Sequence, residues 1–331
     1  MKTCICLLVL TLCASALASA AAAADEPVVA AYQQRMSGQA EKARQQLQTL
    51  TTAQPTLAAA WFELARTQFY LMQLDEAQQA IDKALEMEAN NPRFHHLAGT
   101  TAAYRAVLAA KKLETRDQVG PGMQRWIHEL EQTVTLDPKN YAARIELVNA
   151  YRQTPAEFGG DAAKADALLA VLETESPVDG ATARAATLGD KSDDIVTLWQ
   201  KTVAAHTNDA AAHAGLAQAL LAAKESEKSK AEAQRAVELD GNRIRVYLDL
   251  ARTAGMRGEF ADATAAVKSF LAATPAPAAP LRAYGTFLLA AIEKRQQHND
   301  QADKLLQEAR DIDAHVWTTL VPPPEILFNT P

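Results

Sequence analysis

The sequence predicts an all-α protein built as a solenoid, a linear stack of helical hairpins. A block from Ala58 to Asn91 has a spacing of apolar and small residues that returns in later blocks of about 34 residues. The apolar residues follow the period of a helix, and no segment alternates with the period of a strand. Because each hairpin buries its apolar face only against its neighbours, we expect one elongated array with insertions emerging as loops.

This block resembles the tetratricopeptide repeat (TPR). Trp61 stands at its fourth position, Leu64-Ala65 at positions seven and eight, and small residues, Ala77 and Ala84, at positions 20 and 27. Small residues are needed at positions 8 and 20 because the two helices of a unit cross closely there. The resemblance covers nearly the whole mature chain and implies a right-handed superhelix whose concave face is lined by the first helix of each unit.

Residues 1–24 have the three parts of a secretory signal peptide and are set aside from the fold. Lys2 is the basic start, and 5–17 form an apolar core too short for a permanent membrane span. Small residues follow, and we favour cleavage near Ala24. Such a signal indicates a protein of bacterial type that is periplasmic or secreted.

The three cysteines, Cys4, Cys6 and Cys13, all lie within this signal. The mature chain is therefore expected to have no disulfide, thiolate metal site or cysteine nucleophile. A lipoprotein anchored through Cys13 is the alternative to a cleaved signal. It is disfavoured because Leu12 precedes this cysteine, where bacterial lipoproteins usually have a small residue.

The charge of the chain argues against nucleic acid as a partner. The formal net charge is −7, and loss of Lys2 with the signal makes it −8, which is unfavourable for neutralising a phosphate backbone. No second long apolar run follows the signal, so we expect no transmembrane segment after cleavage.

About eight units are expected between residues 25 and 315, and the most regular ones lie towards the two ends. Units one and two occupy about 24–91, with the second helix of unit two over 75–88. Units six and seven occupy about 210–277, and unit eight opens near Leu281.

Units three to five keep their helices but lose the regular spacing. In unit three a charged loop containing Gly-Pro-Gly is expected over 111–122, before a helix over 123–136. In unit four a second loop covers 154–161, with Asp161 as the N-cap of the next helix. Unit five, about 177–209, is degenerate. The two loops could carry recognition or be tolerated insertions at exposed turns.

Residues 316–331 are expected to form an extended tail, because 322–324 are prolines, which do not continue a helix. We expect this tail to cover the apolar face that the last repeat leaves open. Docking of a partner is the alternative role.

Neither a catalytic site, a metal site nor a cofactor is predicted. His128-Glu129 begins like the zinc-protease helix motif, but Gln132 stands where the second histidine belongs. His95 and His96 are adjacent, and neighbouring residues on a helix point about 100° apart, which favours packing over one shared metal. An enzyme is therefore the least favoured of the functions considered.

The candidate functional surface is the concave one, which in TPR proteins is lined chiefly by positions 2, 5, 9, 12 and 13 of the first helices. Reading these positions in units two, four, seven and eight gives a candidate peptide-binding groove of Phe62, Arg66, Phe69, Tyr70, Asn149, Arg152, Gln153, Arg245, Arg252 and Arg282. Arginines beside aromatic rings favour carboxylates and extended peptide backbone, so a protein or peptide, acidic in character, is the expected partner. Alternatively, the arginines only solvate a helix face while the phenylalanines pack against the neighbouring helix.

These features favour a non-catalytic protein- or peptide-binding scaffold of the bacterial cell envelope. The alternative is a structural subunit of an envelope assembly or secretion complex, in which the outer face and the loops matter more than the groove. The sequence barely separates the two.

Overall fold

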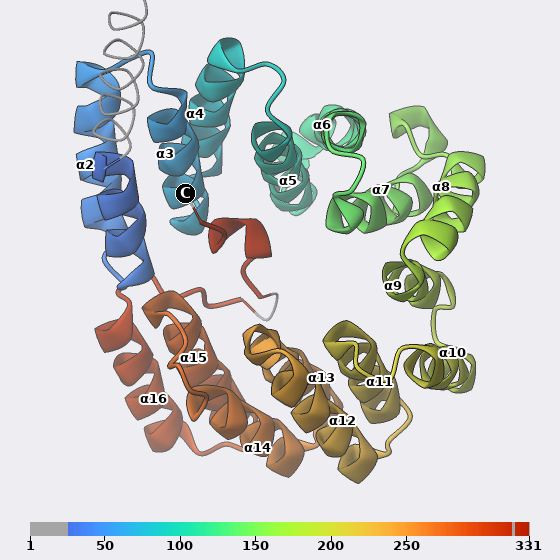
Figure 1. The fold of residues 1–331 in the computed structure, drawn as a ribbon. Helices are drawn as coiled ribbons and strands as arrows, with labels where there is room; N and C mark the ends of the chain where they lie inside the picture. The colour runs from blue at the N-terminus through green and yellow to red at the C-terminus, as the bar shows by residue number, and fades with distance from the viewer. Residues whose placement is uncertain (1–25, 320–321, 331) are drawn as a thin grey trace, which may run out of the picture. The chain divides into compact units, whose positions relative to one another are not determined.

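The computed structural model describes residues 26–319 and 322–330 as a succession of α-helices joined by short turns (Figure 1). The predicted signal, 1–24, lies outside the described residues. Within the described ranges helix follows helix and no strand occurs. The all-α solenoid predicted from the apolar period is confirmed.

The described chain falls into two compact units. Unit 1 contains residues up to Asn90 together with the C-terminal segment from Pro324, and unit 2 runs from Asn91 to Pro323. The elements of unit 1 are a helix over 26–36, α2 (Ala40–Ala53), α3 (Ala58–Tyr70), α4 (Leu74–Met87) and the 3₁₀ helix η4 (Glu325–Leu327).

Unit 2 contains the remaining helices. In chain order they are α5 (Pro92–Ala109), η1 (Leu113–Gln118), α6 (Val119–Leu136), α7 (Tyr141–Gln153), η2 (Ala156–Phe158), α8 (Ala162–Glu175), α9 (Pro177–Thr187), α10 (Ser192–Ala205), α11 (Ala210–Ala222), α12 (Ser226–Leu239), η3 (Gly241–Arg245), α13 (Val246–Arg257), α14 (Phe260–Leu271), α15 (Ala279–Arg295) and α16 (Asn299–Ile312).

Consecutive α-helices pair into hairpins, α3 with α4 in unit 1 and α5 with α6 through α15 with α16 in unit 2. In unit 2 the first helices of neighbouring hairpins also contact one another, α7 with α9, α9 with α11, α11 with α13 and α13 with α15. These first helices therefore form a continuous inner layer from α7 to α15. Side chains on its free face share one surface, the first-helix surface.

The small residues of the repeat lie where the helices of a hairpin meet. Ala65, Ala77 and Ala84 are fully buried, and so is the matching Ala263 of α14, while Ala251 of α13 is 2% exposed. A larger side chain at any of them would push two closely packed helices apart. Trp61 packs at the edge of its hairpin and donates its indole N–H to the carbonyl oxygen of Pro55 at 2.9 Å.

The expected helix over 75–88 is present as α4. The expected loop over 111–122 is wrong for most of its length, because η1 occupies Leu113–Gln118 and α6 begins at Val119 rather than at 123. Proline is tolerated at Pro121 because N–H groups in a first helical turn lack an intrahelical acceptor. Gly122 lets α6 approach α5, since a Cβ there would lie 2.8 Å from the Cβ of Ala106.

The second expected loop, 154–161, is a compact turn that folds back onto α7. It contains η2, and the Asp161 backbone N–H donates to the carbonyl oxygen of Tyr151 at 3.0 Å. A Cβ on Gly160 would lie 1.7 Å from the Thr154 carbonyl oxygen, so only glycine fits this turn. The Asp161 carboxylate accepts from the Lys164 N–H at 3.0 Å, which confirms the predicted N-cap.

No α-helix in the described part of the chain combines the length and the apolar character needed to cross a membrane.

Candidate peptide-binding surface

The predicted groove residues lie on first helices, but they divide between the two units. Phe62, Arg66, Phe69 and Tyr70 belong to α3 of unit 1, whereas the six others belong to unit 2. The four on α3 are at most 3% exposed. In unit 1 these side chains are buried, and one of them, Arg66, contacts a distant segment of the chain itself.

Residues 324–330 lie against α3, where Figure 1 shows the red C-terminal turn. Three consecutive carbonyl oxygens of this segment accept hydrogen bonds from side chains. Leu327 accepts from Arg35 Nη1 at 2.5 Å, and Phe328 accepts from the Tyr32 hydroxyl at 3.1 Å. Asn329 accepts from Arg66 Nη2. The segment is therefore held through its main chain, by side chains of two consecutive first helices.

Arg35 and Arg66 share one carboxylate. Glu63 Oε1 accepts from Arg35 Nε and Nη2 at 2.9 and 2.8 Å, and Glu63 Oε2 accepts from Arg66 Nη1 at 2.9 Å. All three side chains are at most 1% exposed. Two guanidinium groups against one carboxylate leave a net positive charge out of water, which is costly unless further acceptors face it. The carbonyl oxygens of residues 327 and 329 supply such acceptors.

The Tyr32 ring completes this arginine site. Both the Arg35 and the Arg66 guanidinium carbons lie 5.5 Å from its centroid, and Arg66 also lies 5.4 Å from the centroid of Phe62. The negative faces of aromatic rings attract such cations. Hydrogen bonds, ring contacts and the shared carboxylate together fix the direction of both guanidinium groups.

The segment also has an apolar anchor. Ile326 is 7% exposed and Leu327 is fully buried, whereas Glu325 and Asn329 are exposed. Burial of a side chain of this size is worth about 1.5–3 kcal/mol. One apolar pair and three carbonyl groups therefore define how unit 1 holds the segment.

The tail expected over 316–331 thus has two parts. Val316 packs with Ala283 of α15 and Ala309 of α16, and it covers the last hairpin as expected. The docking of 324–330 on unit 1 was not expected, and this part is not wholly extended because η4 forms one 3₁₀ turn.

The tail also touches the first-helix surface of unit 2. Arg245 Nη2 donates to the Pro323 carbonyl oxygen at 2.8 Å. Trp317 packs edge-on against Tyr104 of α5, with ring centroids 6.3 Å apart and an interplanar angle of 71°. Burial, with the Glu146 carboxylate as a smaller cause, raises the pKa of Tyr104 to about 12.

Arg252 and Tyr284 of unit 2 each have a polar atom that makes no hydrogen bond among the described residues. These atoms are Arg252 Nε and the Tyr284 hydroxyl, and both are buried. Burial raises the pKa of Tyr284, while the charges of Arg252 and Arg245 act in the opposite direction, so these groups lie within electrostatic reach of each other. Arg282, two residues before Tyr284 on α15, is half-buried.

The groove residues of α7 are not gathered with these arginines. Arg152 is paired with Asp166 on the second helix of its own hairpin, Asn149 is half-buried and Gln153 is exposed. Arg152 therefore fits the alternative to a groove residue, an arginine on a solvated helix face with a local ion pair.

The adjacent histidines of α5 diverge as their spacing predicts. His95 Nδ1 lies 2.6 Å from Glu129 Oε2 of α6, and His96 Nε2 lies 3.1 Å from Glu146 Oε1 of α7. Among the described residues, no group of three or more His, Cys, Asp or Glu side chains is arranged to hold a metal ion.

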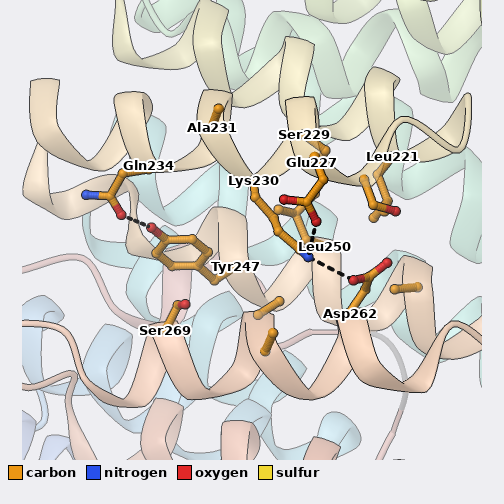
Figure 2. Close-up of a pocket in the computed structure, with 14 residues that line it drawn as sticks. Leu221, Glu227, Ser229, Lys230, Ala231, Gln234, Tyr247, Leu250, Asp262 and Ser269 are labelled. Carbon is orange, nitrogen blue, oxygen red and sulfur yellow. Dashed lines mark hydrogen bonds and ion pairs between the residues drawn. The ribbon is translucent and has the colours of Figure 1, made fainter.

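A pocket of about 410 Å³ opens between α12, α13 and α14 (Figure 2). Lys230 Nζ lies between Glu227 Oε1 at 2.8 Å and Asp262 Oδ1 at 3.0 Å. The Tyr247 hydroxyl donates to Gln234 Oε1 at 2.9 Å. Its charged and aromatic groups thus satisfy one another.

Three residues of the unit 1 site are missing from the predicted groove. Tyr32 and Arg35 occupy positions 9 and 12 of unit one, so the groove positions would have identified them had that unit been included. Glu63 occupies position 6 of unit two, outside those positions. The sequence could have indicated Glu63 because it lies three residues before Arg66, and this spacing brings both side chains onto one helix face.

Several solved structures resemble the chain at low identity. MamA is 15% identical over 61% of this chain and 94% of that chain, with a TM-score of 0.29. Yeast Tom70 is 13% identical over 85% and 67%, with a TM-score of 0.40. The human IFIT1 dimer with m7Gppp-AAAA is 16% identical over 88% and 78%, with a TM-score of 0.43. At these scores the likenesses carry no argument about function.

No curated protein sequence matches the chain. One family model does, that of the tetratricopeptide repeat, and its match covers residues 34–99. This range includes the block in which Trp61, Ala65, Ala77 and Ala84 first indicated the repeat. Residues 34–99 therefore match the tetratricopeptide repeat.

Proposed function

We propose that this protein is a non-catalytic scaffold of the bacterial cell envelope that binds extended peptide segments of other proteins through the first helices of its hairpins. One observation carries the proposal. Unit 1 holds residues 324–330 through three consecutive main-chain carbonyl groups and one buried apolar pair. Because main-chain carbonyl groups occur in every peptide, the same donors suit a segment of another protein.

The expected ligand is acidic as well as extended. Arg245, Arg252 and Arg282 lie on the first helices or directly before them, and a guanidinium group pairs well with a carboxylate. Arg245, Arg252 and Arg282 are each half-buried, so part of each side chain remains accessible to an incoming segment. A carboxylate of that segment would pair with these guanidinium groups.

The envelope location rests on the signal pattern of 1–24, and the protein is proposed to be periplasmic or secreted. Fractionation of cells that express the full chain, with sequencing of the mature N-terminus, tests this part. We expect cleavage near Ala24. An uncleaved chain in the cytoplasm would contradict it.

A peptide-display selection on the immobilised protein tests the binding function. We expect enrichment of segments with carboxylates, and loss of their binding in Arg252→Ala. Lys83→Ala is the matched control, because Lys83 is half-exposed on the second helix α4 and pairs with Glu86. Equal binding by both variants would contradict the proposal, as would turnover of a substrate that Arg252→Ala abolishes.

Cross-linking in intact cells separates the scaffold from the alternative, a structural subunit of an envelope assembly. A photoreactive residue at position 149 of the first-helix surface is expected to trap the partner. A large stable assembly that is trapped only from position 83 would favour the alternative.

A further inference from the structure

We infer that residues 324–330 act as an internal ligand, which occupies the peptide site of unit 1 until a segment of another protein displaces it. The inference rests on the proposed function for the nature of the competitor. It adds that the site is regulated by the chain's own tail and states which features the competitor must share.

The first argument is the way in which the tail is held. Arg35, Tyr32 and Arg66 donate in turn to the carbonyl oxygens of residues 327, 328 and 329. Consecutive acceptors met by consecutive side-chain donors are the contacts expected of a bound peptide. A segment that packs only as a cap needs buried apolar side chains but no such series.

The second argument is that the site needs hydrogen-bond acceptors at the place of the tail carbonyl groups. Each nitrogen of the Arg35 guanidinium is used, Nε and Nη2 by Glu63 and Nη1 by the Leu327 carbonyl oxygen. Arg35 is fully buried. When the tail leaves, Nη1 loses its oxygen acceptor and keeps only the Met36 sulfur at 4.0 Å, a weak acceptor for a buried cationic donor. Water or the main chain of another segment must replace the tail.

The third argument is that the tail buries only two side chains in unit 1. Its buried side chains in unit 1 are Ile326 and Leu327, whereas Glu325, Asn329 and Thr330 are exposed. Its occupancy is raised by covalent attachment, because a tethered ligand has an effective concentration on the order of millimolar. An untethered competitor succeeds when its own affinity exceeds what the tether supplies.

The competitor is therefore an extended segment of another protein that carries two adjacent aliphatic residues and has accessible carbonyl groups after them. Ile326 and Leu327 provide that pair in the tail, and the carbonyl groups of Leu327, Phe328 and Asn329 follow. A side-chain carboxylate is not required in unit 1, because Glu63 already neutralises one of the two guanidinium charges.

A labelled nonapeptide with the sequence of residues 322–330 serves as the probe, and its binding to the full-length chain is measured by fluorescence anisotropy. Leu327→Asp places a charge at a fully buried position and releases the tail. We expect this variant to bind the probe at least about tenfold more tightly than the wild-type chain, because the tethered competitor is gone. Glu325→Gln is the control at an exposed tail position and should bind like wild type.

Tyr32→Phe in the Leu327→Asp chain tests whether the probe binds at the same site. This change removes only the hydroxyl that donates to residue 328, and we expect severalfold weaker probe binding with unchanged circular dichroism. Equal probe binding by wild type and Leu327→Asp would overturn the inference, as would no binding by either chain or insensitivity to Tyr32→Phe.

Sedimentation of the wild-type chain covers the remaining possibility, a tail that binds to a second copy. Monomers at all concentrations are expected, and concentration-dependent dimers that Leu327→Asp abolishes would overturn an internal ligand. Failure here is distinguishable from failure of the proposed function, because the display selection is read out through Arg252 in unit 2.

Discussion

Two arginine clusters, one in each unit, differ in what completes their hydrogen bonds. In unit 1, Arg35 and Arg66 are buried against Glu63 and reach the tail carbonyl groups. In unit 2, Arg245 reaches the Pro323 carbonyl oxygen, while Arg252 Nε is buried with no partner. In unit 1 the buried donors reach a peptide segment, whereas in unit 2 one buried donor has no acceptor among the described residues.

The comparison shows that arginines on the first helices of the two units differ in the hydrogen-bond acceptor that suits them. In unit 1 a carboxylate from the protein lowers the net charge, so neutral carbonyl groups are sufficient acceptors. In unit 2 the half-buried Arg245, Arg252 and Arg282 are accessible from solvent, and a guanidinium group pairs well with an anionic acceptor. The pocket beside Lys230 in Figure 2 contrasts with both, because its charges are paired within the protein.

The largest effect is expected from Glu63→Gln. It leaves two buried guanidinium groups without their shared carboxylate, and breaking a buried ion pair costs about 3–5 kcal/mol. Urea unfolding should show this loss in the free energy of unfolding. The control is Glu41→Gln on α2, whose ion pair with Arg44 is partly exposed and is worth about 0.5 kcal/mol. Equal losses would show that the unit 1 cluster is not electrostatically special.

Ala84→Trp separates the packing of unit 1 from its arginine cluster. Ala84 is a fully buried residue of α4, and overfilling such a position costs about 1–3 kcal/mol. Thermal unfolding should show a lower Tm. Ala53→Trp, at an exposed position of α2, is the control and should melt like wild type. An Ala84→Trp protein that also melts like wild type would mean that the repeat register is wrong.

Most helices could be predicted from the sequence because small residues mark where helices cross. Ala65, Ala77 and Ala84 are buried as the repeat requires, and the helix after Asp161 begins with the predicted N-cap. The start of α6 was missed because Gly-Pro-Gly usually indicates a loop. In a first helical turn proline costs little, and Gly122 is required by the close approach of α5.

The candidate site was harder to predict than the fold. Arg66 followed from its repeat position, whereas its partner Glu63 lies outside the positions that usually face a ligand. The tail was foreseen as a cap of the last hairpin, and Val316 does cover that hairpin. Its docking on α3 depends on contacts nearly 300 residues apart along the chain, for example Tyr32 to Phe328, and no local pattern carries such information.

Arg252→Ala tests the unit 2 cluster at a smaller cost in stability. Arg252 is half-buried and its Nε makes no hydrogen bond, so the free energy of unfolding should change by about 0.5 kcal/mol or less, with unchanged helicity by circular dichroism. Binding of an acidic peptide, measured by calorimetry, should weaken. An unfolded variant would show that Arg252 has a structural role and would remove the contrast with unit 1.

The smallest effect is expected at the paired pocket. The hydrogen bond from Lys230, followed by that from Ser226, lowers the pKa of the Asp262 carboxyl below its ordinary value of 3.8, and burial opposes them. Because the pKa is lower in the folded chain than in the unfolded one, Asp262 stabilises the fold above the unfolded value, and this contribution is lost as the pH falls through the folded value. Asp262→Asn should therefore be less stable than wild type at pH 7, by about 1 kcal/mol or less. In urea unfolding the difference should shrink as the pH is lowered below about 4.

The control is Asp303→Asn, at an exposed position of α16, which should match wild type at every pH. A difference for Asp262→Asn that persists at low pH would mean that the side chain acts through shape rather than charge, and the pocket would no longer serve as the example of charges satisfied within the protein.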